Sequence, residues 1–307
     1  MTEQPHRIDV HAHFAPPEWI AAQGQNLIPA IRNWSINQTI DDMDAAGIER
    51  ALLSITTPGL WFESNATARR IARHSNDFAA TLRADHPGRF GVFTALPLPD
   101  IDGALHEIAY GLDQLKADGV GLLTSYGDKW LGDPTFDPVM AELNRRKAVA
   151  YVHPTSPDCC RNIVPGVPDA AIEFGTDTTR AIARTIFGGA AARFPDIKMI
   201  WSHAGGTMPF LLERFEGMAK MPNYAPKFPN GFAEVARRFH YDTAQVANKL
   251  CMTALREIVP VSQIVFGTDY PFRSALDHVE GLHQCGVFDA AELKTIDRDN
   301  ALRLLRT

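Results

Sequence analysis

The sequence predicts a (β/α)8 TIM barrel that forms a single domain over residues 1–307. Three observations support this prediction. A chain of 307 residues suits one barrel, which typically needs about 250 residues plus loop insertions. Eight short runs rich in Val, Ile and Phe alternate with longer stretches of helical periodicity, an order typical of βα units and a parallel sheet. His-Ala-His ends the first run, where a doubly wound open sheet, the competing architecture, often has a glycine-rich phosphate loop.

The predicted strands are short apolar runs of the kind that a buried parallel sheet requires. In chain order they cover Arg7 to Phe14, Arg50 to Thr56, Phe90 to Leu96, Gly119 to Ser125, Ala148 to His153, Lys198 to His203, Phe239 to Asp242 and Gln263 to Asp269. Eight such repeats favour a closed barrel over an open sheet, which usually has fewer strands.

The predicted helices lie between these strands and after the last one. They cover Thr39 to Ala46, Ser64 to Asp85, Ile101 to Lys116, Asp137 to Arg146, Thr178 to Phe194, Met208 to Met218, Asn248 to Val259, Ser274 to Cys285 and Ala290 to Leu305. Several have end signals: Gly47 follows the first helix, and Asp137-Pro138 would supply the N-cap and first helical residue of the fourth.

Charge and composition indicate a small-molecule role. The net charge of −6 gives no general attraction to nucleic acid or to anionic lipid, so we expect neither partner. No apolar run is long enough for a membrane span, and Met1 to Arg7 is polar, unlike a signal peptide. We therefore expect a cytoplasmic protein with reduced thiols, including the vicinal loop pair Cys159-Cys160.

The first predicted strand carries two histidines at strand spacing. Alternation places Asp9, His11 and His13 on one face and the apolar residues between them on the other. At the C-terminal end of a barrel strand both imidazoles would point into the mouth, where catalytic groups of this fold gather. Together they could bind one divalent ion. The alternative is a pair of inward histidines that are hydrogen-bonded to their neighbours.

Three other strand ends carry residues of the same kind. His153 precedes Pro154, His203 precedes Ala-Gly-Gly, and Asp269 precedes Tyr-Pro. Imidazoles and carboxylates are costly to bury together without a metal or a proton partner. Their convergence at one end of a barrel therefore favours a metal site.

These motifs resemble those of a known family across essentially the whole chain. They are Asp9-Val10-His11-Ala12-His13-Phe14 with Pro16-Pro17, Met43-Asp44-x-x-Gly47, Val152-His153-Pro154, Ser202-His203-Ala204-Gly205-Gly206 and Phe266-Gly267-Thr268-Asp269-Tyr270-Pro271-Phe272. As a set, the sequence resembles the amidohydrolase superfamily of metal-dependent hydrolase barrels, and within it the branch of aminocarboxymuconate-semialdehyde decarboxylase. The resemblance implies that His11, His13, His153 and Asp269 ligate a metal, with His203 beside it as a catalytic histidine.

The predicted centre holds one divalent ion, with zinc expected and manganese as the alternative. Binuclear members of the superfamily use a carbamylated lysine at the end of the fourth strand, but Gly119 to Ser125 contains no lysine. Lys129 follows only in the next loop, where a solvated side chain is expected.

A single Lewis-acidic ion could either activate water or hold a carboxylated substrate while CO₂ departs. The resemblance favours the second reaction, a nonoxidative decarboxylation by a carboxy-lyase. Hydrolysis of a lactone, ester or amide, with Asp269 deprotonating water, is the alternative. An inactive metal-binding barrel is a third possibility, which the presence of both His203 and Asp269 disfavours.

His203 and Asp269 are the candidates for delivering the proton that replaces CO₂. Imidazole titrates near neutral pH, whereas a metal-bound carboxylate is a poor acid unless the site raises its pKa. The alternative role for His203 is to orient a ligand.

Aromatic residues at or just beyond strand ends are candidates for the walls of a substrate pocket. They are Phe14, Trp19, Trp61, Phe62 and Phe272. Arg214 matches an arginine that lies near a dimer-shared site in the relatives, which implies a homodimer and a guanidinium suited to a carboxylate. A surface salt bridge is the alternative for Arg214.

The substrate is expected to differ from that of the semialdehyde decarboxylases, which carry arginines where this chain has Thr39 and Asp41. The segments Thr57 to Trp61 and Thr124 to Trp130 instead resemble the 6-methylsalicylate decarboxylases. We therefore expect a small aromatic acid of hydroxybenzoate type, or a related unsaturated carboxylic acid.

Overall fold

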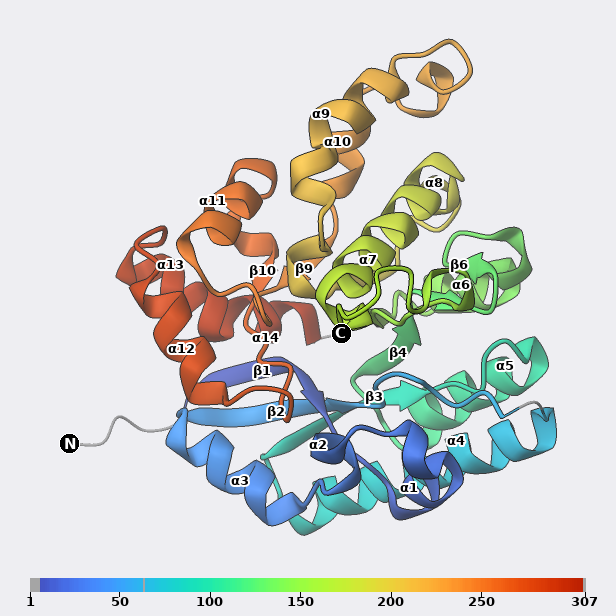
Figure 1. Ribbon diagram of the computed structural model, residues 1–307, viewed down its shortest axis with the longest axis vertical. Coiled ribbons are helices and arrows are strands. Elements are labelled where there is room, and N and C mark those ends of the chain that lie inside the picture. The colour runs from blue at the N-terminus through green and yellow to red at the C-terminus, as the bar shows by residue number, and fades with distance from the viewer. Residues whose placement is uncertain (1–5, 63, 306–307) are drawn as a thin grey trace.

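A ring of eight parallel strands lies at the centre of the computed structural model, which describes residues 6–62 and 64–305 (Figure 1). The strands pair in the order β1 (Arg7–His13), β2 (Ile48–Ser54), β3 (Phe90–Ala95), β4 (Gly119–Leu123), β7 (Val149–His153), β8 (Lys198–Trp201), β9 (His240–Asp242) and β10 (Ile264–Val265). The ring closes because Val10 N–H donates to the carbonyl of Phe266 at 3.0 Å, and Asp269 N–H to that of His11 at 2.8 Å. The predicted barrel is confirmed. Residues 1–5, part of the predicted polar N-terminus, lie outside the described residues.

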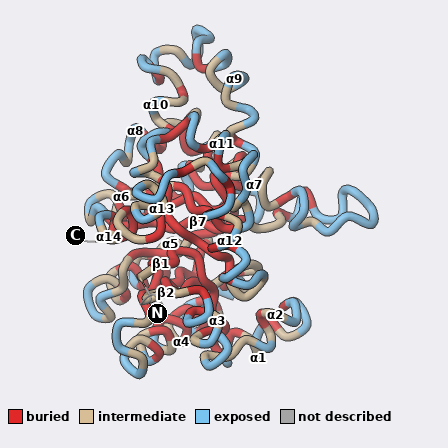
Figure 2. Tube along the Cα trace, turned by 90° about the vertical axis from the view of Figure 1, so that its left-hand side faces the viewer, coloured by how far each residue is buried: buried red, intermediate tan, exposed pale blue. Residues whose placement is uncertain are grey.

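Apolar side chains fill the inside of this ring. They are Ile8, Val10, Leu52, Phe93, Val149, Tyr151, Ile200 and Val265, with Ala301 and Leu304 from the C-terminal helix α14 (Asn300–Leu305). The rings of Phe93 and Tyr151 stack with centroids 5.3 Å apart. A larger apolar cluster fills the layer between strands and helices, so the strands are buried inside a more exposed shell (Figure 2). The barrel is thus a solid support for groups at its mouth.

Strand β1 does not alternate strictly. Its register with β2 shifts between Asp9 and Ala12. Val10 packs in the interior cluster with Tyr151, yet the Tyr151 ring is also 5.1 Å from that of His11. The prediction that Ile8, Val10 and Ala12 lie opposite the histidines is therefore wrong for Ile8 and Val10, which belong to the interior cluster. A β-bulge lets successive residues face the same side.

Every predicted helical stretch contains a helix. The helices before α14 are α1 (Pro17–Gln23), α2 (Pro29–Arg32), α3 (Ile36–Ala45), α4 (Asn65–Asp85), α5 (Ile101–Ala109), α6 (Asp137–Arg145), α7 (Asp169–Phe187), α8 (Ala190–Arg193), α9 (Met208–Ala219), α10 (Phe232–Ala236), α11 (Lys249–Ile258), α12 (Ala275–Gln284) and α13 (Ala290–Lys294). Among the described residues, no helix combines the length and apolarity needed to cross a membrane.

Several boundaries differ from those predicted. Helix α7 begins at Asp169 rather than Thr178 and breaks at Gly188-Gly189. Asp137 is the first residue of α6 rather than its N-cap. Helices α1, α2 and α10, and the hairpin of β5 (Ser125–Tyr126) and β6 (Lys129–Trp130), were not predicted. These short elements lack the length at which periodicity becomes visible.

A buried ion pair joins the first strand to the C-terminal segment. Arg7 Nε lies 3.1 Å from Asp297 Oδ2, and the same oxygen is 2.9 Å from His283 Nε2. Arg7 also donates to the carbonyl of Ala46 at 2.9 Å. Asp297 is 1% exposed, so the pair ties the ends of the chain together away from water.

We expect Asp297→Ala to lower the free energy of unfolding by about 3 kcal/mol, because it leaves the Arg7 charge buried without its partner. Urea unfolding measures this effect. The matched control is Asp277→Ala, which removes the exposed pair between Arg273 and Asp277 and should change stability by no more than about 0.5 kcal/mol. Equal effects of the two substitutions would contradict this account of the buried pair.

Candidate active site

The ends of four strands bring five predicted residues into one buried cluster. Nε2 of His11 lies 3.1 Å from Nε2 of His13, and both nitrogens lie 3.0 Å from Asp269 Oδ1. Nε2 of His153 is 3.8 Å from the same oxygen. His203 approaches from the other side, with its Nε2 3.3 Å from Asp269 Oδ2. All five residues are buried.

Hydrogen bonds on the far side of three rings determine where their protons lie. Nδ1 of His11 faces a carboxylate oxygen of Asp242 at 2.7 Å. Nδ1 of His13 lies 3.3 Å from the carbonyl of Ser54 and 3.1 Å from its hydroxyl oxygen, whose own hydrogen is donated to the carbonyl of Ala12. Nδ1 of His153 lies 2.8 Å from the carbonyl of Pro154. Since these partners are acceptors, each Nδ1 carries the hydrogen. In the neutral rings, each Nε2 then presents a lone pair to the same point.

The cluster therefore requires positive charge at its centre. Three lone pairs and a carboxylate converge there, and Nε2 of His153 has no hydrogen-bond partner among the described residues. Burial alone would lower the pKa of His11, but the carboxylates of Asp242 and Asp269 outweigh burial and raise it to about 10. Without a metal, a proton on Nε2 of His11 therefore supplies the positive charge, and a metal ion would replace that proton. Burial lowers the pKa of His13 and of His153. This donor set fits a divalent metal ion.

The backbone at the site is held in an uncommon conformation. His203, Ala204, Gln245 and Asp269 have φ between 54° and 65°, the left-handed region that costs energy for residues other than glycine. The next residues explain the turn after β8: a Cβ on Gly206 would lie 2.0 Å from the carbonyl oxygen of Gly175. The Ser-His-Ala-Gly-Gly sequence thus lets this turn pack directly on α7.

Gly267 has a similar role beneath the cluster. An added Cβ would lie 2.9 Å from Cβ of His11 and 3.0 Å from Cβ of Asp242. Only glycine leaves room for the contact between those two side chains.

Several supporting residues were not predicted from the sequence. Asp242, at the end of β9, accepts from His11 and from the backbone N–H of His203 at 2.8 Å. Gln245 donates from Nε2 to Asp269 Oδ2 at 3.0 Å. Asp242 could have been found, since it ends a predicted strand as His153 does. Gln245 carries no such signal, because its position depends on a loop.

The geometry allows two ways to choose four ligands. His11, His153, His203 and Asp269 each offer an atom within 4.8 Å of the others, while His13 is closer to His11 and Asp269 than His203 is to Asp269. Among the described residues, the only hydrogen bond of the His203 ring is with Asp269. Its tautomer is therefore not fixed by a rear acceptor, which distinguishes it from the other three rings.

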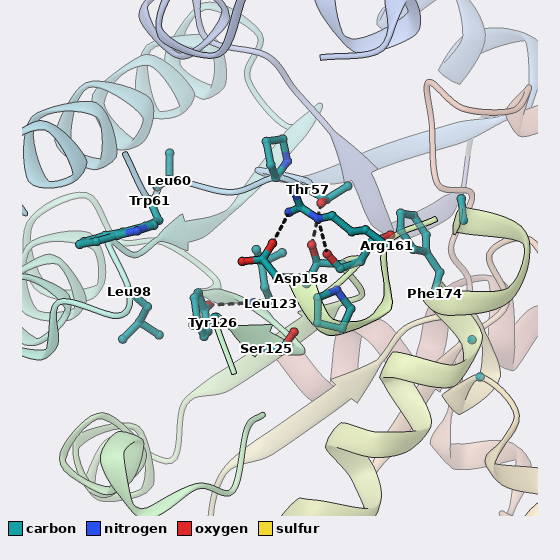
Figure 3. A pocket seen from close by; sticks show the side chains of 18 of the residues that line it. Thr57, Leu60, Trp61, Leu98, Leu123, Ser125, Tyr126, Asp158, Arg161 and Phe174 are labelled. Carbon is teal, nitrogen blue, oxygen red and sulfur yellow. Dashed lines mark hydrogen bonds and ion pairs between the residues drawn. The ribbon is translucent and has the colours of Figure 1, made fainter. Parts of the chain in front are cut away.

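A cavity of about 1420 Å³ opens beside the cluster. His203, Asp269 and Gln245 line it, as do the predicted wall residues Trp61 and Phe272. Phe174, which was not predicted, lines the cavity with its ring 6.0 Å from that of His153, while Phe272 is 5.6 Å from His13. Figure 3 shows Phe174 on one side of the cavity and Trp61 on the other, with Arg161 between them.

Two predicted wall residues belong to the core instead. Phe14 is 1% exposed and stacks on Phe78, and Trp19 is fully buried with its Nε1 donating to the carbonyl of Gly59 at 2.8 Å. Neither lines the cavity, and neither does Phe62. These predictions were wrong because an aromatic residue after a strand can turn outward against the helices as readily as into the mouth.

Arg214 and Lys129 are both exposed. Arg214 lies on α9 outside the cavity lining, and among the described residues no ion pair involves it. Lys129 lies in the β5–β6 hairpin at the cavity wall. Cys159 and Cys160 have their sulfur atoms 2.8 Å apart and do not line the cavity.

Comparisons with known proteins agree with this architecture. The family model described as Amidohydrolase matches residues 8–307. Decarboxylase yanB of Aspergillus niger is 34% identical, covering 97% of this chain and 87% of its own. The 6-methylsalicylic acid decarboxylase of Penicillium expansum is 35% identical, covering 86% of this chain and 85% of its own.

The crystal structure of a 2,6-dihydroxybenzoate decarboxylase complexed with 2,6-dihydroxybenzoate has the same fold. It superimposes with a TM-score of 0.87 at 24% identity, covering 99% of this chain and 100% of that one. With a family model that spans nearly the whole sequence, and with the barrel and histidine cluster that the motifs predicted, the chain belongs to the amidohydrolase family.

Proposed function

We propose that this protein is a metal-dependent, nonoxidative decarboxylase of hydroxybenzoate-type acids. The observation that carries the proposal is the convergence of three imidazole lone pairs and one carboxylate oxygen beside a cavity. Relatives that match across most of their length are named as decarboxylases, one of them of 6-methylsalicylic acid. The family and the site together favour a carboxy-lyase.

One divalent ion would be held by Nε2 of His11, His13 and His153 and by Oδ1 of Asp269. We prefer this set because rear acceptors fix all three rings with their lone pairs inward. Three imidazoles and one carboxylate suit zinc, while a related dihydroxybenzoic acid decarboxylase is described with bound manganese, so both ions are candidates. Bound there, the ion would supply a Lewis acid for the substrate's carboxylate and adjacent oxygen.

The pair of His203 and Asp269 would hold the proton that replaces CO₂ on the ring. The two oxygens of Asp269 have different surroundings: Oδ1 faces the three ligand rings, and Oδ2 faces His203 and Gln245. A proton on the His203 side can thus be held without occupying the ligand oxygen. Both residues line the cavity, as a group that protonates substrate must.

Phe174 and Phe272 would flank the substrate ring. The ring centroid of Phe174 lies 6.0 Å from that of His153, and that of Phe272 lies 5.6 Å from that of His13; both residues line the cavity. Flat apolar walls bind a planar aromatic acid and displace water from the reacting carbon. That environment favours loss of CO₂ over attack by water.

We also propose a homodimer, as the resemblance implied. Arg214 is exposed and outside its own cavity, so it could contact a substrate only in a partner subunit. Light scattering of the purified protein tests the dimer. The expected cytoplasmic location stays a prediction.

Incubated with a panel of hydroxybenzoates and lactones, the metal-loaded protein should release CO₂ from at least one hydroxybenzoate and leave the lactones intact. The released CO₂ and the phenolic product are measured together. Lactone turnover without decarboxylation of any acid would replace this proposal by the hydrolase.

His153→Ala should lose the bound metal and reduce decarboxylation below detection, because it removes one of the four proposed ligands. Nε2 of His153 has no hydrogen-bond partner among the described residues, so it is free to bind the metal. Elemental analysis after dialysis gives the metal per chain. His74→Ala is the control: His74 is half-exposed and pairs with Glu18 at 3.2 Å on the surface, so its loss should leave metal content and turnover unchanged. A His153→Ala protein with full metal occupancy would refute this ligand set.

His203→Asn should lower kcat by at least about 100-fold, the usual contribution of a general acid, while the metal content stays at the wild-type value. Stopped assays and elemental analysis on the same preparation test both statements. If the metal is lost as well, His203 belongs to the ligand set; if kcat is unchanged, it carries no proton.

A further inference from the structure

The cavity has a second end, built from a different quarter of the barrel. Its walls are Leu27, Ile31, Leu60, Trp61, Leu98 and Leu123, which we call the apolar annex. These residues lie on α2 and its approach, on the loops after β2 and β3, and on β4. His203, Gln245 and Asp269 follow β8, β9 and β10, which lie across the ring from β2–β4. Figure 3 shows Leu60, Trp61 and Leu98 together, away from Phe174.

The walls of the annex are apolar, and two polar side chains that line the cavity beside it are engaged within the protein. Gln23 donates to the carbonyl of Gly59, and the hydroxyl of Tyr126 accepts from the N–H of Leu123. Its five aliphatic residues are between 1% and 8% exposed, whereas Trp61 is 43% exposed. The cations that line the cavity, Lys129 and Arg161, are exposed, and Arg161 is paired with Asp158 at 3.2 Å. A charged substituent would therefore find no free buried partner among the described residues here, while an apolar one would leave water for a hydrophobic wall.

Hydrogen bonds from α1 fix the loop that carries two of the annex residues. Trp19 and Gln23 of α1 donate to the carbonyl of Gly59 at 2.8 and 3.1 Å, which fixes the loop that carries Leu60 and Trp61. Gly59 has φ 81°, and a Cβ there would lie 2.7 Å from Leu123 Cδ1. The loop thus packs directly on β4, and Trp19, wrongly predicted as a wall, positions the residues that do form it.

The cavity is larger than a single-ring acid requires. Its volume of about 1420 Å³ exceeds the roughly 300–1,000 Å³ of sites for drug-sized ligands. With the carboxylate at the histidine cluster and the ring between Phe174 and Phe272, the annex would remain empty for a substrate with only a methyl group.

We propose that the apolar annex is a specificity subsite for an alkyl or aryl substituent larger than methyl on the ring of the substrate acid. This inference rests on the proposed decarboxylase function, since it places the carboxylate at the metal cluster. It narrows the substrate class from simple hydroxybenzoates to hydroxybenzoates with an extended apolar substituent.

Steady-state kinetics with salicylates that carry a methyl or a pentyl group, at ring position 4 or 6, tests the subsite. At least one pentyl isomer should have a kcat/KM about tenfold or more above that of its methyl counterpart. Each additional buried CH₂ contributes a factor of about four, so four of them allow this gain even with incomplete burial. If neither pentyl isomer exceeds its methyl counterpart, the subsite is refuted while the decarboxylase stands.

Leu98→Phe should narrow the annex and lower the ratio of pentyl to methyl kcat/KM by about tenfold or more. Leu250→Phe is the matched control, because Leu250 is 68% exposed on α11 and outside the cavity; its ratio should equal that of the wild type. Should Leu98→Phe fail to fold, Trp61→Ala serves instead, since the exposed indole can be removed without opening the core, and the same fall in the ratio is expected. An unchanged ratio in the folded variant refutes the subsite.

Binding of the phenolic products separates the subsite from the reaction. Calorimetry on the metal-loaded protein should show 3-pentylphenol binding at least about tenfold more tightly than 3-methylphenol. If no salicylate is decarboxylated but this preference is found, the proposed reaction fails and the subsite stands. If the two phenols bind equally, the subsite fails whatever the enzyme decarboxylates.

Discussion

Three imidazoles and a carboxylate lie together in a buried space at the mouth of this barrel. The electrostatic cost of this arrangement is offset by hydrogen bonds from the residues around it. Each ring is turned by an acceptor behind it, so that lone pairs rather than protons meet at the centre. Asp242 orients His11 and also accepts from the N–H of His203, so one carboxylate positions both a proposed ligand and the proposed acid. Gly267 is needed because Asp242 and His11 must touch. A cation at the centre compensates the convergence, and the donor set fits a divalent metal ion.

The rest of the fold supplies the rigidity that this cluster requires. The residues of the cluster leave from strand ends whose inner face is filled with packed apolar side chains. The uncommon backbone at His203 and Asp269 is restrained by hydrogen bonds from the N–H of His203 to Asp242 and from the N–H of Asp269 to the carbonyl of His11. Loops form much of the cavity wall away from the cluster. The β2–α4 loop, supported by α1, and the β5–β6 hairpin form walls of the cavity, as loops at the mouth of this fold commonly do. The proposed catalytic groups and the apolar annex therefore belong to different parts of the barrel mouth.

Periodicity and strand-end residues sufficed to predict the eight strands and to gather His11, His13, His153, His203 and Asp269, because in a parallel barrel all strands end at one mouth. They did not suffice where contacts between residues far apart in the sequence determine the direction or position of a side chain. The bulge that turns Val10 inward depends on the register with β2, and Gln245 reaches Asp269 only through a loop with positive φ. Phe14 and Trp19 were assigned to the pocket because they follow a predicted strand end. The sequence does not show whether the chain after a strand turns toward the cavity or toward the helices. Phe174 was missed because the predicted helix began after it.

The proposed reaction depends on one ion held by His11, His13, His153 and Asp269, with His203 outside the ligand set. Anomalous diffraction from a crystal of the zinc- or manganese-loaded protein tests this most directly. We expect one anomalous peak, about 2.0–2.2 Å from the three Nε2 atoms and from Asp269 Oδ1, as such ligands require. A second peak, or a single peak bound by His203 in place of His13, would contradict the assignment of ligand and acid on which the proposed reaction rests.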